Sequence, residues 1–122
     1  MDFCQSGLAV IETEGAAVLK LTQQINHEFE KACALLFSCE GRIIVTGMGK
    51  SGHIGKKIAA TFASTGSPAF FVHPAEANHG DLGMVTPTDM IIAISNSGKT
   101  NEIISLLPHF KRLDVPIISL TG

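Results

Sequence analysis

Four short apolar runs constrain the fold of this chain more than any other feature of its sequence. The runs are RIIVTG (42–47), AFFVH (69–73), DMIIAIS (89–95) and VPIISLTG (115–122). None of them alternates apolar and polar residues, which is typical of strands in a parallel sheet with both faces covered. Parallel strands need crossover connections, so helices are expected between the runs. The sequence therefore predicts an α/β domain with a parallel sheet of at least four strands.

The segments between the runs have the expected helical spacing. Ile54, Ile58 and Phe62 recur every fourth residue after the first run, and Gly66 is the expected stop. The segment TNEIISLLPHFKRL follows the third run, and Pro108 is expected to kink its helix. Its apolar positions are Ile103, Ile104, Leu107 and Phe110. The resulting β-α-β-α order favours a sheet that binds ligands beyond the carboxyl ends of its strands.

Residues 3–39 have a different pattern and are predicted to form one or two helices. Spacings of three and four residues place one seam along them, which consists of Leu8, Ile11, Gly15, Val18, Thr22, Ile25, Phe29, Ala32 and Leu36. The seam fits a helical layer over the sheet and a contact between copies of the chain equally well. We interpret residues 1–40 as a helical segment of the same domain as the α/β core at 41–122.

Composition narrows the classes of function. The chain has 122 residues, 45% of them hydrophobic and 16% charged, as expected for one soluble domain. A net charge of -2 with scattered basic residues argues against nucleic-acid binding. Apolar stretches are too short for a membrane span, and no signal peptide is evident. Cys4, Cys33 and Cys39 have no metal-binding spacing, so buried, reduced thiols in a cytoplasmic protein are expected.

Two runs end in loops suited to binding an anion. The first is followed by GMGKSG (47–52), where Gly47 and Gly49 allow a sharp turn and Ser51 can cap a helix or donate to a phosphate. The third ends in SNSGKT, in which the candidate ligand-binding residues are Ser95, Asn96, Ser97, Gly98 and Thr100. Three hydroxyls and a glycine at a strand-to-helix junction favour a phosphate cradle over simple capping.

Other interpretations of these residues fit less well. The glycines match the dinucleotide pattern G-x-G-x-x-G, but the second run ends in His73 and Pro74 without the acid that would hold a ribose. A Walker A loop fails because its first glycine would fall at Ile44. A metal site is a weaker alternative, and its candidate ligands are His73, Glu76, His79 and Asp81. No metal or other cofactor is predicted.

Three segments resemble the arabinose-5-phosphate isomerases, which belong to the sugar isomerase (SIS) domain superfamily. The segments are GMGKSGHIGKKIAATFASTG, FFVHPAEANHGDLGMV and AISNSGKTNEI. The resemblance implies a flavodoxin-like SIS domain in which Ser51 and the loop 95–100 bind a sugar phosphate. It also implies a cytoplasmic tetramer that interconverts D-arabinose 5-phosphate and D-ribulose 5-phosphate, a step that supplies Kdo for lipopolysaccharide.

The resemblance also assigns catalytic roles to Lys50, His79 and Glu102. An aldose–ketose isomerisation needs a base, a proton route between two oxygens and groups that stabilise an enediolate, and it needs no redox cofactor. Lys50 could polarise the carbonyl or be a solvated lysine, and Glu102 could act on the substrate or only stabilise a helix start. His79 could shuttle protons, and His53 is the weaker candidate histidine.

In the resembling family, the SIS domain continues with another strand, a further catalytic glutamate and histidine, and usually two CBS domains. We therefore expect residues 1–122 alone to bind a sugar phosphate and to turn it over poorly. Two other classes remain as alternatives. A non-catalytic sugar-phosphate sensor would use the same loops, and a nucleotide-binding domain would use only Gly47 to Gly52.

Overall fold

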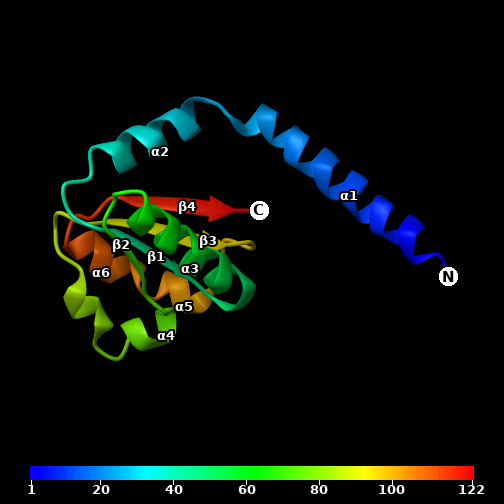
Figure 1. The fold of residues 1–122 in the computed structure, drawn as a ribbon. Coiled ribbons are helices and arrows are strands. Elements are labelled where there is room, and N and C mark those ends of the chain that lie inside the picture. The colour runs from blue at the N-terminus through cyan, green and yellow to red at the C-terminus, as the bar shows by residue number, and fades with distance from the viewer. The chain divides into compact units, whose positions relative to one another are not determined.

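The structure is a computed structural model that describes residues 1–122 and divides into two compact units, Met1–Ala34 and Leu35–Gly122. The helices predicted for residues 3–39 are α1 (Phe3–Lys20), the 3-10 helix η1 (Leu21–Gln24) and α2 (His27–Phe37) (Figure 1). Helix α2 crosses the boundary between the two units. Side-chain caps begin both α-helices: Asp2 Oδ1 accepts a hydrogen bond from the Gln5 amide, and Asn26 Oδ1 accepts one from the Glu28 amide, each at 3.0 Å.

Most of the apolar seam of the N-terminal helices is exposed in the structure, and Leu36 at its end packs half-buried against the core. Leu8, Ile11 and Val18 are 61%, 68% and 64% exposed, and neither α1 nor α2 contains a buried residue. The prediction of buried thiols is wrong for Cys4 and Cys33, which are free and exposed, because both lie on these helices. No helix of the structure combines the length and the apolar character needed to cross a membrane.

The second unit contains the predicted parallel sheet. Its strands are β1 (Ile43–Gly47), β2 (Ala69–Phe71), β3 (Met90–Ser95) and β4 (Ile117–Thr121), and they lie in the order β2-β1-β3-β4. All three pairings are parallel, and each strand falls within one of the four apolar runs. Strand β2 is the shortest because the chain turns into a helix at Pro74, directly after the run. The predicted α/β class is therefore confirmed.

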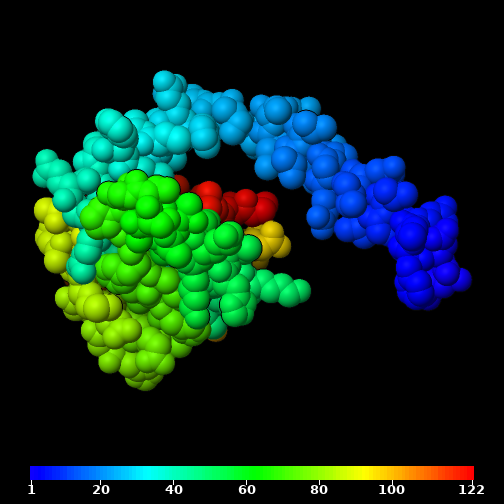
Figure 2. All heavy atoms as spheres, in the orientation of Figure 1, coloured from blue at the N-terminus to red at the C-terminus, as the bar shows by residue number.

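Helix α3 (Gly49–Ser64) covers one face of the sheet through its smallest residues. Gly52, Gly55 and Ala59 are buried, whereas Ile54, which the spacing predicted to face the core, is 57% exposed. A Cβ atom at Gly55 would lie 3.0 Å from the ring of Phe71, so the absent side chain lets the helix approach β2 closely. The α3 residues, green in Figure 2, form much of the face turned toward the viewer.

The opposite face is covered by four short helices, and the sequence predicted the last two of them as one kinked helix. They are α4 (Pro74–Ala77), the 3-10 helix η2 (Asp81–Met84), α5 (Asn101–Ile104) and α6 (Leu107–Arg112). The segment after β3 breaks at Ser105 and Leu106, and Pro108 lies in the first turn of α6. The predicted core positions Ile103 and Phe110 are buried, but Ile104 is 45% exposed and Leu106, which the spacing did not predict, is fully buried.

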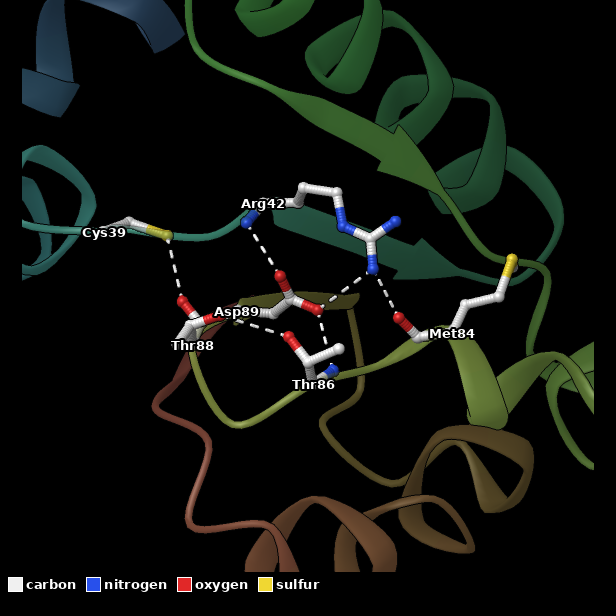
Figure 3. A network of polar contacts seen from close by, with 6 residues as sticks. All are labelled: Cys39, Arg42, Met84, Thr86, Thr88 and Asp89. Carbon is white, nitrogen blue, oxygen red and sulfur yellow. Dashed lines mark hydrogen bonds and ion pairs between the residues drawn. The ribbon is translucent and has the colours of Figure 1, made fainter.

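A buried carboxylate joins the amino ends of β1 and β3 (Figure 3). Asp89 is 3% exposed and accepts hydrogen bonds from the amides of Arg42 and Thr86, each at 2.8 Å. The Arg42 guanidinium lies 3.4 Å from Asp89 Oδ2 and also donates to the Met84 carbonyl. Burial raises the pKa of the Asp89 carboxyl, but these hydrogen bonds outweigh burial and hold the pKa below its usual range.

Asp89→Asn is expected to lower the free energy of unfolding at neutral pH and to flatten its dependence on acid. An amide places an NH2 group against a backbone donor, and each unsatisfied buried donor costs about 1–3 kcal/mol. Because the folded pKa is depressed, the carboxylate stabilises the fold above its unfolded pKa of about 3.9. That contribution is lost as the pH falls through the folded pKa.

Urea midpoints at pH 7 and near pH 3 measure this effect in wild type and variant. The difference between the midpoints of wild type and Asp89→Asn should be smaller near pH 3 than at pH 7. Asp81→Asn, at an exposed position, should change neither midpoint. A difference of the same size at both pH values would contradict the assigned role of Asp89.

Candidate functional site

The carboxyl ends of β1 and β3 form the topological switch point of the sheet. β1 and β3 are neighbours at the centre of the sheet. From β1 the chain continues to β2 on one side of this pair, and from β3 it continues to β4 on the other side. Their crossover helices accordingly lie on opposite faces, α3 against Val45 and α5 with α6 against Ile91. Gly47 pairs with Ile94, so the loops that follow β1 and β3 leave the same edge side by side. A crevice for a ligand is expected at such an edge.

The loop after β1 enters its helix before Ser51. Helix α3 begins at Gly49, and its N-cap is Met48, which makes no side-chain capping bond. Of the two roles considered for Ser51, capping is thereby excluded, since Ser51 lies within the first turn, where it is half-buried. The amide groups at the start of α3 therefore have no side-chain acceptor, and the positive end of this 16-residue helix lies at the carboxyl end of β1.

The loop after β3 is held in shape by its own hydroxyl groups. Ser95 is 7% exposed, its Oγ lies 2.7 Å from Thr100 Oγ1, and it accepts a hydrogen bond from the Gly98 amide at 3.1 Å. Ser97 Oγ is exposed and accepts from the Lys99 amide at 3.0 Å. Gly98 has a φ of 68°, which glycine adopts without strain. Ser95 thus shapes the loop, whereas Ser97 lies on its surface.

The three predicted catalytic residues come from different elements and are all exposed. Lys50 is in the first turn of α3, Glu102 is the second residue of α5, and His79 follows α4. No hydrogen bond or ion pair joins their side chains, and the ion pairs of the structure are His27–Glu30, Lys31–Glu28 and Arg42–Asp89. No salt bridge therefore competes with a ligand for the side chains of Lys50 and Glu102. Because α5 has only four residues, a helix dipole is a weak reason for Glu102 to be acidic.

The structure does not assemble the alternative metal or nucleotide sites. No group of three or more His, Cys, Asp or Glu side chains is placed to hold a metal ion. His73 instead caps α4, since its Nδ1 accepts from the Ala75 amide at 3.2 Å. The segment after β2 continues directly into α4, so no acidic side chain ends that strand for a ribose.

Sequence reasoning missed two polar residues on the elements that carry His79 and Glu102. Asn78 Nδ2 lies 3.3 Å from Ser105 Oγ, and this hydrogen bond joins the end of α4 to the end of α5. The residues are 27 positions apart. Neither belongs to a motif, and only the position of Asn78 directly before His79 could have directed attention to it.

Comparison with known proteins defines the class of this site. The SIS domain family model matches residues 35–122, the same residues as the α/β unit. The chain belongs to the SIS domain family. It is 60% identical over 121 residues to the arabinose 5-phosphate isomerases KdsD of Shigella flexneri and of Escherichia coli strain K12. Those matches cover 99% of this chain and 37% of each relative.

A solved structure supports the same family assignment. A protein of E. coli CFT073, solved in complex with arabinose 5-phosphate, is 44% identical and superposes with a TM-score of 0.90. The match covers 99% of this chain and 66% of that chain. The resemblance seen in the sequence is thereby confirmed, and the four-stranded parallel sheet is the SIS fold.

Proposed function

We propose that the protein is an aldose–ketose isomerase that interconverts D-arabinose 5-phosphate and D-ribulose 5-phosphate. The observation that carries the proposal is the pair of glycine- and hydroxyl-rich loops at one switch point, in a chain 60% identical to arabinose 5-phosphate isomerases. The non-catalytic sensor is less well supported, because relatives at this identity bear an enzyme's name. We further propose that the reaction supplies Kdo synthesis in the cytoplasm.

The phosphate would lie between the two loops. The uncapped amides at the start of α3 and the hydroxyls of Ser51, Ser97 and Thr100 supply donors at the switch-point edge. Gly47 and Gly49 keep side chains out of the first loop, and Asn96 lies in the second. Charge-assisted hydrogen bonds of this kind hold a dianion without a large basic patch. This arrangement accounts for phosphate binding by a chain of net charge -2.

The reaction requires a proton to leave C2 of the aldose and a proton to reach C1, with the carbonyl moving from C1 to C2. We propose that Glu102 exchanges the carbon-bound proton and that Lys50 stabilises the enediolate oxygens. His79 would carry a proton between the oxygens or assist ring opening. The uncommitted charges of Lys50 and Glu102 support these assignments, since neither is in an ion pair.

A direct assay tests the proposed function. The full-length protein is incubated with arabinose 5-phosphate, and ribulose 5-phosphate is followed over time. Unphosphorylated D-arabinose is the matched control, and it should neither react nor bind by calorimetry. Equal affinity for the sugar and its phosphate would contradict the assignment of the loops, and lack of turnover with arabinose 5-phosphate would contradict the assigned reaction.

Replacing Ser95 and Ser97 together by Ala is expected to weaken binding of arabinose 5-phosphate by at least about 10–100-fold. Ser97 would lose a direct phosphate contact, worth about 1.5–3 kcal/mol, and Ser95 would release the turn at Gly98. Calorimetry measures the change. Ser38→Ala is the control, because its hydroxyl bonds the Leu35 carbonyl outside both loops. Unchanged affinity in the double variant would show that the loop is not the phosphate site.

We also propose that the protein is a homo-oligomer, with a tetramer as the expected state. The exposed apolar residues of α1, among them Leu8 and Ile11, support a contact between copies. Light scattering after gel filtration measures the mass. Replacing Leu8 and Ile11 by Ser should lower the mass, and an oligomer unaffected by that change would contradict the role of this seam.

A further inference from the structure

We infer that Asn78 and Ser105 position the catalytic segments for one another, through a hydrogen-bonded bridge between α4 and α5. The inference rests on the proposed function, since it assigns these residues a role in isomerisation. The Asn78 amide donates to the Pro74 carbonyl and to Ser105 Oγ, each at 3.3 Å. Ser105 Oγ in turn donates to the Glu102 carbonyl at 2.9 Å. We call these contacts the Asn78–Ser105 bridge.

The donors and acceptors of the Asn78–Ser105 bridge balance. The Asn78 carboxamide has two N–H donors, and the structure gives it two acceptors. The Ser105 hydroxyl has one proton, which goes to the Glu102 carbonyl, and its lone pairs accept from Asn78. The bridge therefore fixes one rotamer of each side chain without leaving a donor unused.

The two ends of the Asn78–Ser105 bridge lie at residues with proposed catalytic roles. His79 follows Asn78 in the chain, and its own amide bonds the Glu76 carbonyl at 2.9 Å. Glu102 supplies the carbonyl that accepts from Ser105. A shift of α4 relative to α5 would change the separation of the His79 imidazole and the Glu102 carboxylate. Proton transfers are sensitive to misplacements of about 1 Å, so this separation affects turnover.

These elements need a tertiary contact to be held in place. Helices α4 and α5 have four residues each, too few to be stable by their own hydrogen bonds. Their buried residues Ala77 and Ile103 belong to one apolar core, which holds the helices against the sheet. Apolar contacts are not directional, however, and permit small shifts. The directional contact between the two segments is the hydrogen bond from Asn78 to Ser105.

The test uses Ser105→Ala and Asn78→Leu in the full-length protein. Asn78→Leu approximates the size of the side chain and removes both N–H donors and the acceptor, so no hydrogen bond to Ser105 can re-form. Each variant should lower kcat about tenfold and leave KM for arabinose 5-phosphate within about twofold, because the phosphate loops are unchanged. Ser105→Thr retains the hydroxyl and should restore most of kcat. The double variant should be no slower than either single variant, because both remove the same contact.

Ser64→Ala is the matched control. Its hydroxyl makes the same type of bond, to the Thr61 carbonyl at 3.0 Å, without a partner on another element. If Ser105→Ala behaves like Ser64→Ala, or if the two bridge substitutions are additive, the positioning role is wrong. A change only in melting temperature with normal kcat would also overturn it. An inactive wild type would instead contradict the proposed function itself, and with it this inference.

Discussion

Glu102→Gln in the full-length protein should lower kcat by about 10²–10⁴-fold while KM for arabinose 5-phosphate changes little. Proton transfer by a positioned side chain typically contributes this much, and an amide cannot accept a carbon-bound proton. The exposed side chain of Glu102 makes no ion pair, so its loss should not unfold the protein. Steady-state kinetics and a melting curve of the same sample separate the two effects.

Glu40→Gln is the matched control for this substitution. Glu40 is also an exposed glutamate, but it lies before β1, at the opposite end of that strand from the two loops, and no role in binding or catalysis is assigned to it. Its kcat should stay within about twofold of wild type. If Glu102→Gln retained wild-type turnover, the base would have to be another residue. A lower melting temperature with unchanged kinetics would indicate that Glu102 only stabilises the start of α5.

Gly52→Ala should both destabilise the α/β unit and disrupt the first phosphate loop. A Cβ atom at this buried position would lie 2.7 Å from the Gly47 carbonyl oxygen, which is closer than real Cβ contacts allow. Because the contact is to backbone, either α3 or the end of β1 must move. Overpacking of this kind costs about 1–3 kcal/mol. Urea unfolding should show a lower midpoint, and affinity for arabinose 5-phosphate should fall in the protein that remains folded.

Gly15→Ala is the control for the general effect of a methyl group on a helix. No atom lies within 4 Å of a Cβ built at Gly15, which lies inside α1. Alanine is favoured over glycine by about 1 kcal/mol in a helix interior, so this variant should not be less stable than wild type. Gly52→Ala with wild-type stability and affinity would show that α3 can move away from β1 without consequence.

The strands of this protein are encoded by local sequence patterns, whereas the buried faces of its helices depend on tertiary contacts. Strands β1 and β3 were found because a strand buried on both faces must be apolar at every position. The helix after β1 was also found, and two of its three predicted core positions, Ile58 and Phe62, pack partly buried against the core. The spacing also pointed to Ile54, whereas the close approach of α3 to Phe71 buried Gly52 and Gly55. Glycine carries no hydrophobic signal, so its burial follows from packing and not from periodicity.

The single kinked helix predicted after β3 was wrong for a similar reason. Pro108 fits the first turn of a helix, so it lies at the start of α6 instead of kinking a longer helix. The break at Ser105 allows Leu106 to enter the core beneath the sheet. Whether Leu106 is buried depends on how far the chain must travel from the end of β3 to reach that core. This distance is a property of the folded unit, and a local sequence pattern does not record it.

The sequence by itself determined the parallel sheet, the two loops at its carboxyl edge and the identity of the residues offered to a ligand. Each of these follows from local composition, because strands, turns and hydroxyl-rich loops are encoded by neighbouring residues. Only the tertiary structure decided that Ser95 is buried in its own loop and that Asn78 meets Ser105 across 27 positions. A hydrogen bond between distant segments requires both backbones to be placed within a few tenths of an ångström, and that placement is set by packing of the whole unit.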